Sequence, residues 1–435
     1  MKDYDLALNQ LIAFCGQETF KSGLDRLRPI FAPFTSLAQQ LVANNQLQIV
    51  TIAGTNGKGQ CAFQLSDLLA KNEKEVFTWT SPHILSIEER VRHNLRPIST
   101  QDFLNGLEEI KKQKLSLSFY EACFWIFCFH SFLKIQDILQ SNINSKITIV
   151  LEVGLGGRLD AVNLFDAQVV LIPSIGRDHK EYLGETTREI LTEKWGVVRS
   201  ESVVFSSLNQ KYLRDFCQQK LLKSSLHIDI FDRGDVDENW CYQQRNLYLS
   251  LLAYFYLIDQ RVDIDAQSLS FYQKNPPFMG PGRHEQMTRR GVSFIFIGAH
   301  NLDGHRAMIK QLASENQGYC EQSRPLYERV FISFSQRDND EIYSCLKGFL
   351  DAPCISRSIV LSSFQDLHPR AASAVQLEAI YHDLKCTQAM TSGELRFDPE
   401  WSKNIFKDLP AHSKVLVTGS YYFIGEFQKA LQMFE

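Results

Sequence analysis

Short apolar stretches alternate with longer segments in which apolar residues recur at helical spacing along nearly the whole chain. This alternation is typical of parallel sheets that are covered by helices on both faces. It therefore predicts an α/β fold. The expected strands are 48–53, 75–80, 147–153, 167–173, 202–206, 293–297, 328–334, 358–363 and 414–418.

A segment rich in proline and glycine interrupts the alternation at residues 274–282, and we interpret it as a linker. Strand and helix patterns resume after it. The length of 435 residues is enough for two domains of ordinary size. We therefore predict one domain over residues 1–280 and a smaller α/β domain over 281–435.

The segment 54–60 (Gly-Thr-Asn-Gly-Lys-Gly-Gln) lies between a predicted strand and a predicted helix. Glycines let backbone N–H groups approach an anion, the helix N-terminus adds partial positive charge, and Lys58 adds a full one. The loop differs from the common form G-x-x-x-x-G-K-[ST] because Gly59 and Gln60 follow the lysine. We predict nucleotide phosphate binding. A simple strand–helix connection is the alternative.

Polar residues follow two further strands of the first domain. Glu152 lies at the carboxyl end of an apolar strand, at the edge where open α/β sheets bind ligands. A carboxylate there suits Mg²⁺, although a pair with Arg158 is the alternative. His179 follows the strand 167–173, and Lys194 lies on a predicted helix. Periodicity alone assigns them no role, since a structural histidine and a solvated lysine are common.

Three stretches of the second domain place polar groups near strand ends. They are 282–285 (Gly-Arg-His-Glu), 298–301 (Gly-Ala-His-Asn) and 419–420 (Gly-Ser). Each by itself indicates a turn. Together they are consistent with a binding cleft between the domains.

Composition limits the partners and the compartment. Hydrophobic residues make up 44% and charged residues 22%, which is typical of a globular protein. A net charge of −4 disfavours nucleic acid and anionic membranes as partners. The most apolar run, 122–133, predicts a buried core helix rather than a membrane span. Ten cysteines without C-x-x-C pairs and an acidic N-terminus without an apolar run indicate a cytoplasmic protein with reduced thiols.

Taken in order, these motifs resemble the folylpolyglutamate synthase/dihydrofolate synthase family, a branch of the Mur-type ATP-dependent ligases. The resemblance runs from about residue 20 to 427. The phosphate loop begins at residue 54, so no long substrate domain precedes it, and this favours the folate branch. The segments that carry the resemblance are 54–59, 81–83, 89–91, 120–121, 152–163, 178–179, 183–184, 193–196, 282–283, 299–301 and 418–420.

The resemblance implies a P-loop-containing, Mur-ligase-like ATPase domain with a parallel-rich sheet, and a smaller Rossmann-like domain for glutamate ligation. In such an enzyme ATP phosphorylates the carboxylate of dihydropteroate or a reduced folate, and the amine of L-glutamate attacks the acyl phosphate. It further implies small-molecule substrates, two Mg²⁺ sites and a monomer. The alternatives are a Mur-like ligase for a different acid and a nucleotide-binding homologue with reduced ligase activity.

The same resemblance implies residue roles. The expected ATP contacts are Thr55, Asn56, Gly57, Lys58, Gly59, Gln60, Asn246 and Arg283. The expected magnesium ligands are Ser81, Glu152 and His179. The expected catalytic residues are Lys58, His300 and Lys194, of which Lys194 would be carbamylated. The expected pterin or folate contacts are Phe20, Lys21, Ser22, Tyr120, Glu121, Ala122, Cys123, Leu159, Asp160 and Ala161. The expected glutamate contacts are His300 and Ser420.

Some positions depart from the family pattern. Gln60 replaces the usual Ser or Thr of the loop, and Ile297 replaces an Asp. By strand alternation we expect Ile297 to lie where the cleft requires a carboxylate. The sequence therefore predicts a weak ligase that the change Ile297→Asp would improve. The further departures are Val162, Leu302 and the pair Arg337-Asp338.

Overall fold

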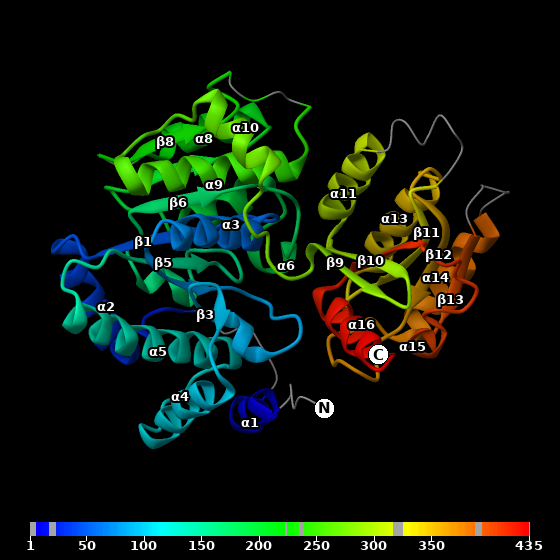
Figure 1. The fold of residues 1–435 in the computed structure, drawn as a ribbon, viewed down its shortest axis with the longest axis horizontal. Helices are drawn as coiled ribbons and strands as arrows, with labels where there is room; N and C mark the ends of the chain where they lie inside the picture. The colour runs from blue at the N-terminus through cyan, green and yellow to red at the C-terminus, as the bar shows by residue number, and fades with distance from the viewer. Residues whose placement is uncertain are drawn as a thin grey trace. The chain divides into compact units, whose positions relative to one another are not determined.

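Figure 1 shows the computed structural model of the chain, which describes residues 6–16, 23–221, 224–234, 236, 239–315, 325–387 and 394–434. The chain divides into two compact units, Met1–Met279 and Gly280–Glu435. Each unit carries its own sheet and its own apolar core, so each is described by itself.

The first unit contains an eight-stranded sheet in the order β4-β3-β2-β5-β1-β6-β7-β8. In this order, the six strands β2, β5, β1, β6, β7 and β8 pair in parallel with their neighbours in that group. The short strands β3 and β4 at one edge pair antiparallel. The predicted parallel-rich α/β class is thus confirmed. The strands are β1 (Leu47–Ile52), β2 (Glu75–Trp79), β3 (Val91–His93), β4 (Arg96–Pro97), β5 (Ile147–Glu152), β6 (Val169–Ile172), β7 (Val203–Ser206) and β8 (Leu226–Asp229).

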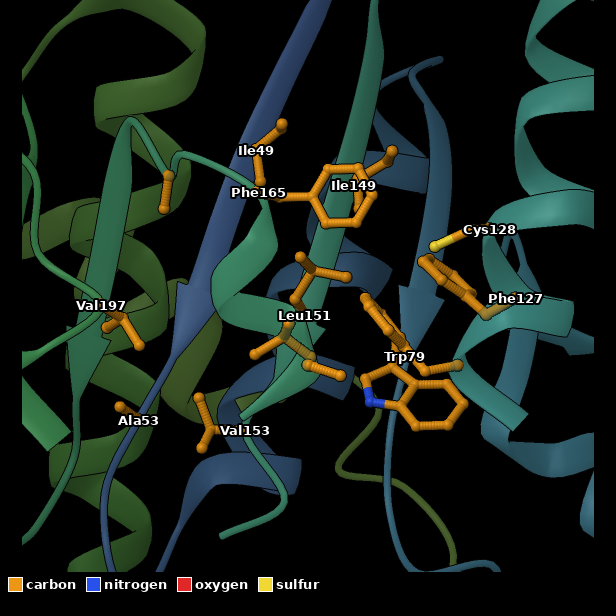
Figure 2. Close-up of a cluster of buried hydrophobic side chains, with 14 of the residues drawn as sticks. Ile49, Ala53, Trp79, Phe127, Cys128, Ile149, Leu151, Val153, Phe165 and Val197 are labelled. Carbon is orange, nitrogen blue, oxygen red and sulfur yellow. The ribbon is translucent and has the colours of Figure 1, made fainter. Parts of the chain in front are cut away.

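Helices cover both faces of this sheet. Val50 and Ile52 of β1 belong to a core with helices α3 and α9, whereas Ile49 belongs to a core with α2 and α5. Figure 2 shows Ile49, Ile149 and other residues of the second of these cores. The helices are α1 (Leu6–Cys15), α2 (Arg28–Ala43), α3 (Lys58–Lys71), η1 (Ile87–Arg90), α4 (Thr100–Lys112), α5 (Phe119–Ser141), η2 (Ala161–Leu164), α6 (Lys180–Leu183), α7 (Thr187–Trp195), α8 (Lys211–Lys220), α9 (Tyr242–Asp259) and α10 (Ala266–Lys274).

Helix α5 is a core helix, as its apolar run predicted. Within the described ranges it is the one helix long and apolar enough to cross a membrane by length and composition. Its Phe124 stacks on Phe31 of α2 with ring centroids 5.6 Å apart, and lies 5.3 Å from the ring of Trp79 on β2. The apolar composition of α5 is therefore explained by packing between α2 and the sheet.

The second unit has a six-stranded sheet in the order β13-β12-β11-β14-β10-β9. Only β9 is antiparallel to its neighbour. The strands are β9 (Arg283–Arg289), β10 (Val292–Gly298), β11 (Tyr327–Ser333), β12 (Ser356–Ser362), β13 (Glu394–Asp398) and β14 (Lys414–Gly419). The helices are α11 (Leu302–Glu315), α13 (Asn339–Leu350), α14 (Ala374–Thr387), α15 (Trp401–Asn404) and α16 (Tyr421–Gln432).

Strand β9 corrects the sequence interpretation of residues 282–285 as a turn. Arg283 begins a strand that forms a hairpin with β10. The two connecting residues, Arg290 and Gly291, have positive φ of 49° and 74°, as tight hairpin turns require. Strand β9 lies at the sheet edge and its side chains are half-buried or exposed, so it lacks the apolar pattern that marked the other strands.

Candidate functional site

The phosphate loop joins β1 to α3. Gly57 has φ of 90°, and a Cβ on it would lie 2.8 Å from the amide nitrogen of Asn246, so only glycine fits there. Lys58 is the first residue of α3. Its Nζ donates to the carbonyls of Gly54 at 3.0 Å and Thr55 at 3.1 Å. The loop thus brings an ammonium group and the free N–H groups of a helix start together, an arrangement suited to phosphate.

The loop is fastened to the segment that follows β6. The backbone N–H of Gly176 donates to Thr55 Oγ1 at 3.0 Å. Ser174 Oγ accepts from the N–H of Asn56 and donates to its carbonyl, both at 2.9 Å. These contacts restrain the conformation of the loop. Sequence analysis missed Ser174 and Gly176; the only sequence signal was their position directly after a predicted strand.

Gln60 points toward α9. Its Oε1 accepts from Asn246 Nδ2 at 2.9 Å, and the side chain is buried. Its Nε2 is buried without a hydrogen-bond partner. The position at which the family pattern has Ser or Thr is therefore used here to join α3 to α9.

We expect Gln60 and Asn246 to be energetically coupled. Their hydrogen bond predicts a coupling of about 0.5–1.5 kcal/mol in the free energy of unfolding. Urea titration of Gln60→Ala, Asn246→Ala and the double variant measures it. The exposed Gln113, replaced by alanine together with Asn246→Ala, serves as the additive control. If the stability changes of Gln60→Ala and Asn246→Ala were also additive, the result would contradict this hydrogen bond.

Glu152 lies beside the phosphate loop. It ends β5, pairs in register with Ile52 of β1, and its buried Oε2 accepts from the backbone N–H of Ser81 at 3.0 Å. The alternative was that Glu152 pairs with Arg158. Arg158 instead forms an ion pair with Glu193, at 3.0 Å. The carboxylate thus lies at the sheet edge next to the loop.

His179 has φ of 51°, and its ring nitrogens lie 3.9 Å from carboxylate oxygens of Asp178 and Glu181. Among the described residues, no group of three or more His, Cys, Asp or Glu side chains forms a metal cage. Mg²⁺ commonly uses one or two carboxylates and completes its shell with water and substrate phosphates. A single buried carboxylate beside a phosphate loop fits that chemistry.

Lys194 is buried, with 4% of its surface exposed, which contradicts the alternative of a solvated lysine. The pKa of its amine is lowered from 10.5 to about 7, mainly by burial and also by the positive charge of Lys58, against the opposing effects of Asp178 and Asp160. A Cβ on Gly157 would lie 2.9 Å from the carbonyl of Lys194. The glycine-rich segment after β5 therefore packs directly on this turn of α7.

Tyr120 and Asp160 form a buried polar cluster. Tyr120 Oη donates to Asp160 Oδ1 at 3.1 Å and accepts from Trp79 Nε1 at 3.3 Å. Asp160 Oδ2 accepts from the N–H groups of Gly154 at 2.9 Å and Leu155 at 3.1 Å. Burial raises the pKa of Asp160, and burial together with Asp160 raises the pKa of Tyr120. Asp160 thus holds the glycine-rich segment in place.

The other expected pterin contacts have different environments. Glu121 accepts from the N–H of Ser118 at 2.8 Å and pairs with Arg26, so it caps α5. Ala122 and Cys123 are fully buried in the apolar core and present no side-chain surface to a substrate, which corrects the expectation of contacts there. Leu159 is half-buried and Ala161 is buried. Phe20, Lys21 and Ser22 lie outside the described residues.

In the second unit the expected residues gather at the carboxyl ends of β10 and β14. His300 lies two residues after the end of β10, and Ser420 caps α16, with its Oγ 2.9 Å from Ser335 Oγ. The Arg283 guanidinium lies 5.0 Å from the centre of the Tyr421 ring, and the His300 ring lies 5.9 Å from it. Sequence analysis missed Tyr421 and Ser335.

The expectation for Ile297 was wrong. Its side chain is 2% exposed and belongs to the apolar core that includes Met308 and Val330. Its neighbour Phe296 lies on the opposite face, where it packs on Phe427. The alternation pattern distinguishes two faces but cannot show that both are covered by helices. Both faces are covered here, so no carboxylate is missing from a solvent-filled site.

Solved structures share this fold over nearly the full chain. Escherichia coli FolC in complex with DHPP and ADP covers 98% of this chain and 97% of its own, with a TM-score of 0.70 and 22% identity. A Mycobacterium tuberculosis folylpolyglutamate synthase complexed with ADP gives a TM-score of 0.71 at 19% identity, with 99% of each chain covered. No family model matches the chain.

The fold and the phosphate loop define an ATP-dependent ligase of the Mur-ligase-like class. Dihydrofolate synthase/folylpolyglutamate synthase of Bacillus subtilis is 25% identical over 452 aligned positions, with 95% of each chain covered. The enzyme of the same name from Buchnera aphidicola (subspecies Baizongia pistaciae) is 31% identical over 307 positions, with 67% of this chain and 70% of the relative covered. The chain belongs to the dihydrofolate synthase/folylpolyglutamate synthase family, as its motifs predicted.

Proposed function

We propose that this ligase joins L-glutamate to dihydropteroate, to reduced folates, or to both, through an acyl phosphate. The observation that carries the proposal is the grouping of Lys58, Glu152 and the buried Lys194 in one unit. Glu152 is in register with the strand that leads into the phosphate loop, and Lys58 is close enough to influence the pKa of Lys194. Family membership supplies the substrate classes.

Lys58 and the N–H groups at the start of α3 hold the phosphates of ATP in this proposal. Phosphoryl transfer depends mainly on positioning and on stabilising charge, so a loop fastened before binding is favourable. The acid substrate's carboxylate attacks the γ-phosphorus, the bond to ADP breaks, and an acyl phosphate forms. The glutamate amine then attacks the acyl carbon and phosphate leaves. His300 and Ser420 bind the incoming glutamate.

Magnesium would be held by Glu152, Ser81 and His179, and would neutralise phosphate charge. A second ion is proposed at Lys194. An amine with a pKa of about 7 is about half neutral at pH 7 and largely neutral above it, so it can react with CO₂ to give an anionic carbamate. That reaction replaces a repelling ammonium with a carboxylate-like ligand.

The acid substrate is proposed to bind at the cluster of Tyr120 and Asp160. Tyr120 is the half-buried member, so its ring presents surface, while Asp160 is occupied by its four described donors. We also propose a cytoplasmic monomer without nucleic-acid or membrane partners. Nine described cysteines are free thiols, which is consistent with a reducing compartment.

A coupled ADP-release assay tests the function. Dihydropteroate and tetrahydrofolate are supplied separately, each with and without L-glutamate, and Lys58→Ala measures the background. We expect ADP release to require ATP, one acid substrate and glutamate together. The proposal would be contradicted if ADP release did not depend on glutamate. It would also be contradicted if the Lys58→Ala variant still released ADP.

Glu152→Gln is expected to weaken the magnesium dependence while the fold is kept. The amide preserves shape but removes the charge that a hard cation prefers. A charged contact of about 1.5–3 kcal/mol corresponds to a roughly ten- to hundredfold increase in the magnesium concentration for half-maximal rate. Titration of Mg²⁺ measures it, with the exposed Glu108→Gln as a matched control. Equal titrations for both variants would exclude Glu152 as a ligand.

A further inference from the structure

Tyr421 lies at the centre of the residues that the second unit contributes to the proposed function. It is the first residue of α16 and follows Ser420 directly. Its ring has Arg283 of β9 over one side and His300 nearby in a tilted arrangement, at 5.0 Å and 5.9 Å between the respective centres. No role for Tyr421 follows from the motifs of the chain.

The ring of Tyr421 packs against the backbone at Gly298. A Cβ on Gly298 would lie 2.2 Å from Tyr421 Cε1 and 2.4 Å from its Cζ. The ring therefore occupies the space that any other side chain at position 298 would take. Gly298 ends β10 two residues before His300, so the ring packs against the strand that leads to the histidine.

A β-bulge directs Arg283 toward the ring. Phe296 pairs with Glu285 and Ile297 pairs with Arg283, so His284, with φ of 58°, is the extra residue of the bulge. Bulges commonly turn a side chain toward a site and are unfavourable without such a use. Arg283 Nη1 also donates to the carbonyl of Pro281 at 2.9 Å, which restricts the guanidinium further.

Helix α16 is held to the same strand. Gln428 Nε2 donates to Glu285 Oε2 at 2.9 Å, and the same carboxylate oxygen accepts from the N–H of Gly282 at 2.8 Å. The helix that carries Tyr421 and the strand that carries Arg283 are thus connected independently of the ring. The ring contact is therefore available for positioning Arg283 rather than for holding the helix.

We propose that Tyr421 is a positioning residue of the ligase: its aromatic face orients Arg283 for the nucleotide and His300 for L-glutamate. The proposal rests on the proposed function, because it takes the roles of Arg283 and His300 from it. A guanidinium is attracted to the electron-rich face of an aromatic ring, an attraction that an aliphatic side chain of similar bulk does not provide. The ring, not the hydroxyl, is the functional part.

Steady-state kinetics of Tyr421→Phe and Tyr421→Leu test the proposal. We expect Tyr421→Phe to retain the wild-type constants, because it keeps the ring. Tyr421→Leu should raise the KM for ATP about three- to thirtyfold, the range that a cation–π contact supports. It should also raise the KM for L-glutamate, because the ring contact of His300 is lost. The KM for the acid substrate should stay within about twofold, since its proposed contacts belong to the first unit. A purely structural role would not separate these constants.

Tyr381→Leu is the matched control. Tyr381 of α14 also has a cation near its ring, Lys385 at 5.7 Å, but lies among none of the proposed site residues. The Tyr381→Leu variant should therefore keep the wild-type KM values for ATP, L-glutamate and the acid substrate. If Tyr421→Leu leaves the KM for ATP and glutamate unchanged, or if Tyr421→Phe is as impaired as Tyr421→Leu, the proposal is overturned.

A second comparison separates action through Arg283 from damage to the fold. In the Arg283→Met background, Tyr421→Leu should no longer raise the KM for ATP, because the group that it positions is absent. An equal increase in both backgrounds would overturn the proposal. Wild-type enzyme without glutamate-dependent ADP release would instead refute the proposed function itself, so the two failures are distinguishable.

Discussion

Lys194→Met is expected to abolish ligation while it raises the free energy of unfolding. The folded protein holds the amine with a pKa of about 7, whereas the unfolded chain holds it near 10.5. Between these two values the unfolded state binds more protons, so stability falls as the pH decreases from 10.5 to about 7 and is constant below. At about 1.4 kcal/mol per pKa unit, removal of the amine should stabilise by roughly 3–5 kcal/mol at neutral pH.

Urea unfolding in CO₂-free buffer at pH 7 and at pH 10 measures this effect. The gain should be large at pH 7 and small at pH 10, and the variant should release no ADP above background. The exposed Lys71→Met is the control and should change stability little at either pH. A gain that is independent of pH would mean that the amine is not held in its neutral form.

Carbamylation adds a second readout to the same experiment. In buffer with bicarbonate, wild-type protein should gain a signal from a lysine carbamate in ¹³C nuclear magnetic resonance, and Lys194→Met should lack it. The reaction consumes the neutral amine, so the signal should grow as the pH rises through about 7. Its absence in active wild-type enzyme would contradict the carbamate without affecting the stability prediction.

Ile297→Asp is expected to unfold the second unit rather than to improve the enzyme. Ile297 is buried in an apolar core that also contains Met308 and Leu312. Thr418 Oγ1 already donates to the carbonyl of Ile297 at 2.7 Å, so its proton is not available to a new carboxylate at position 297. A carboxylate without a partner in such a place should cost several kcal/mol, more than about 3.

Circular dichroism and urea titration measure the loss of stability. Ile297→Val is the matched control, because removing one methylene group from a packed core costs only about 0.5–1.5 kcal/mol. Ile297→Asn introduces a polar side chain without a full charge. Its loss of stability should lie between those of Ile297→Val and Ile297→Asp. A folded Ile297→Asp protein with higher turnover would restore the hypothesis that a catalytic carboxylate is missing from this position.

The fold could be predicted largely from local patterns. Buried parallel strands are continuous apolar runs, so β1 and β5 were found within one residue of their ends. Strand β9 was missed because its side chains are polar at a sheet edge, where pairing depends on the partner strand rather than on an apolar pattern. Strand β8, with His227 and Asp229 among its four residues, was missed for the same reason.

The candidate site was predictable only where a motif carries its own chemistry. Glycines around a lysine identify a phosphate loop because that chemistry is local, and the carboxyl end of a strand suggested Glu152. The sequence could not show that Gln60 turns to Asn246, since the two are 186 residues apart and the hydrogen bond depends on how α3 packs on α9. Nor could it show that both faces of β10 are covered.

The sequence by itself determined the class of fold, the family and the residue types available for catalysis, because these depend on short-range periodicity and on ordered motifs. Only the tertiary structure decided that Lys194 is buried, that Ile297 belongs to a core and that the Tyr421 ring lies near both Arg283 and His300. Burial and ring contacts arise from segments distant in the chain. The pKa of an amine and the orientation of a guanidinium follow from those surroundings, which no single stretch of sequence contains.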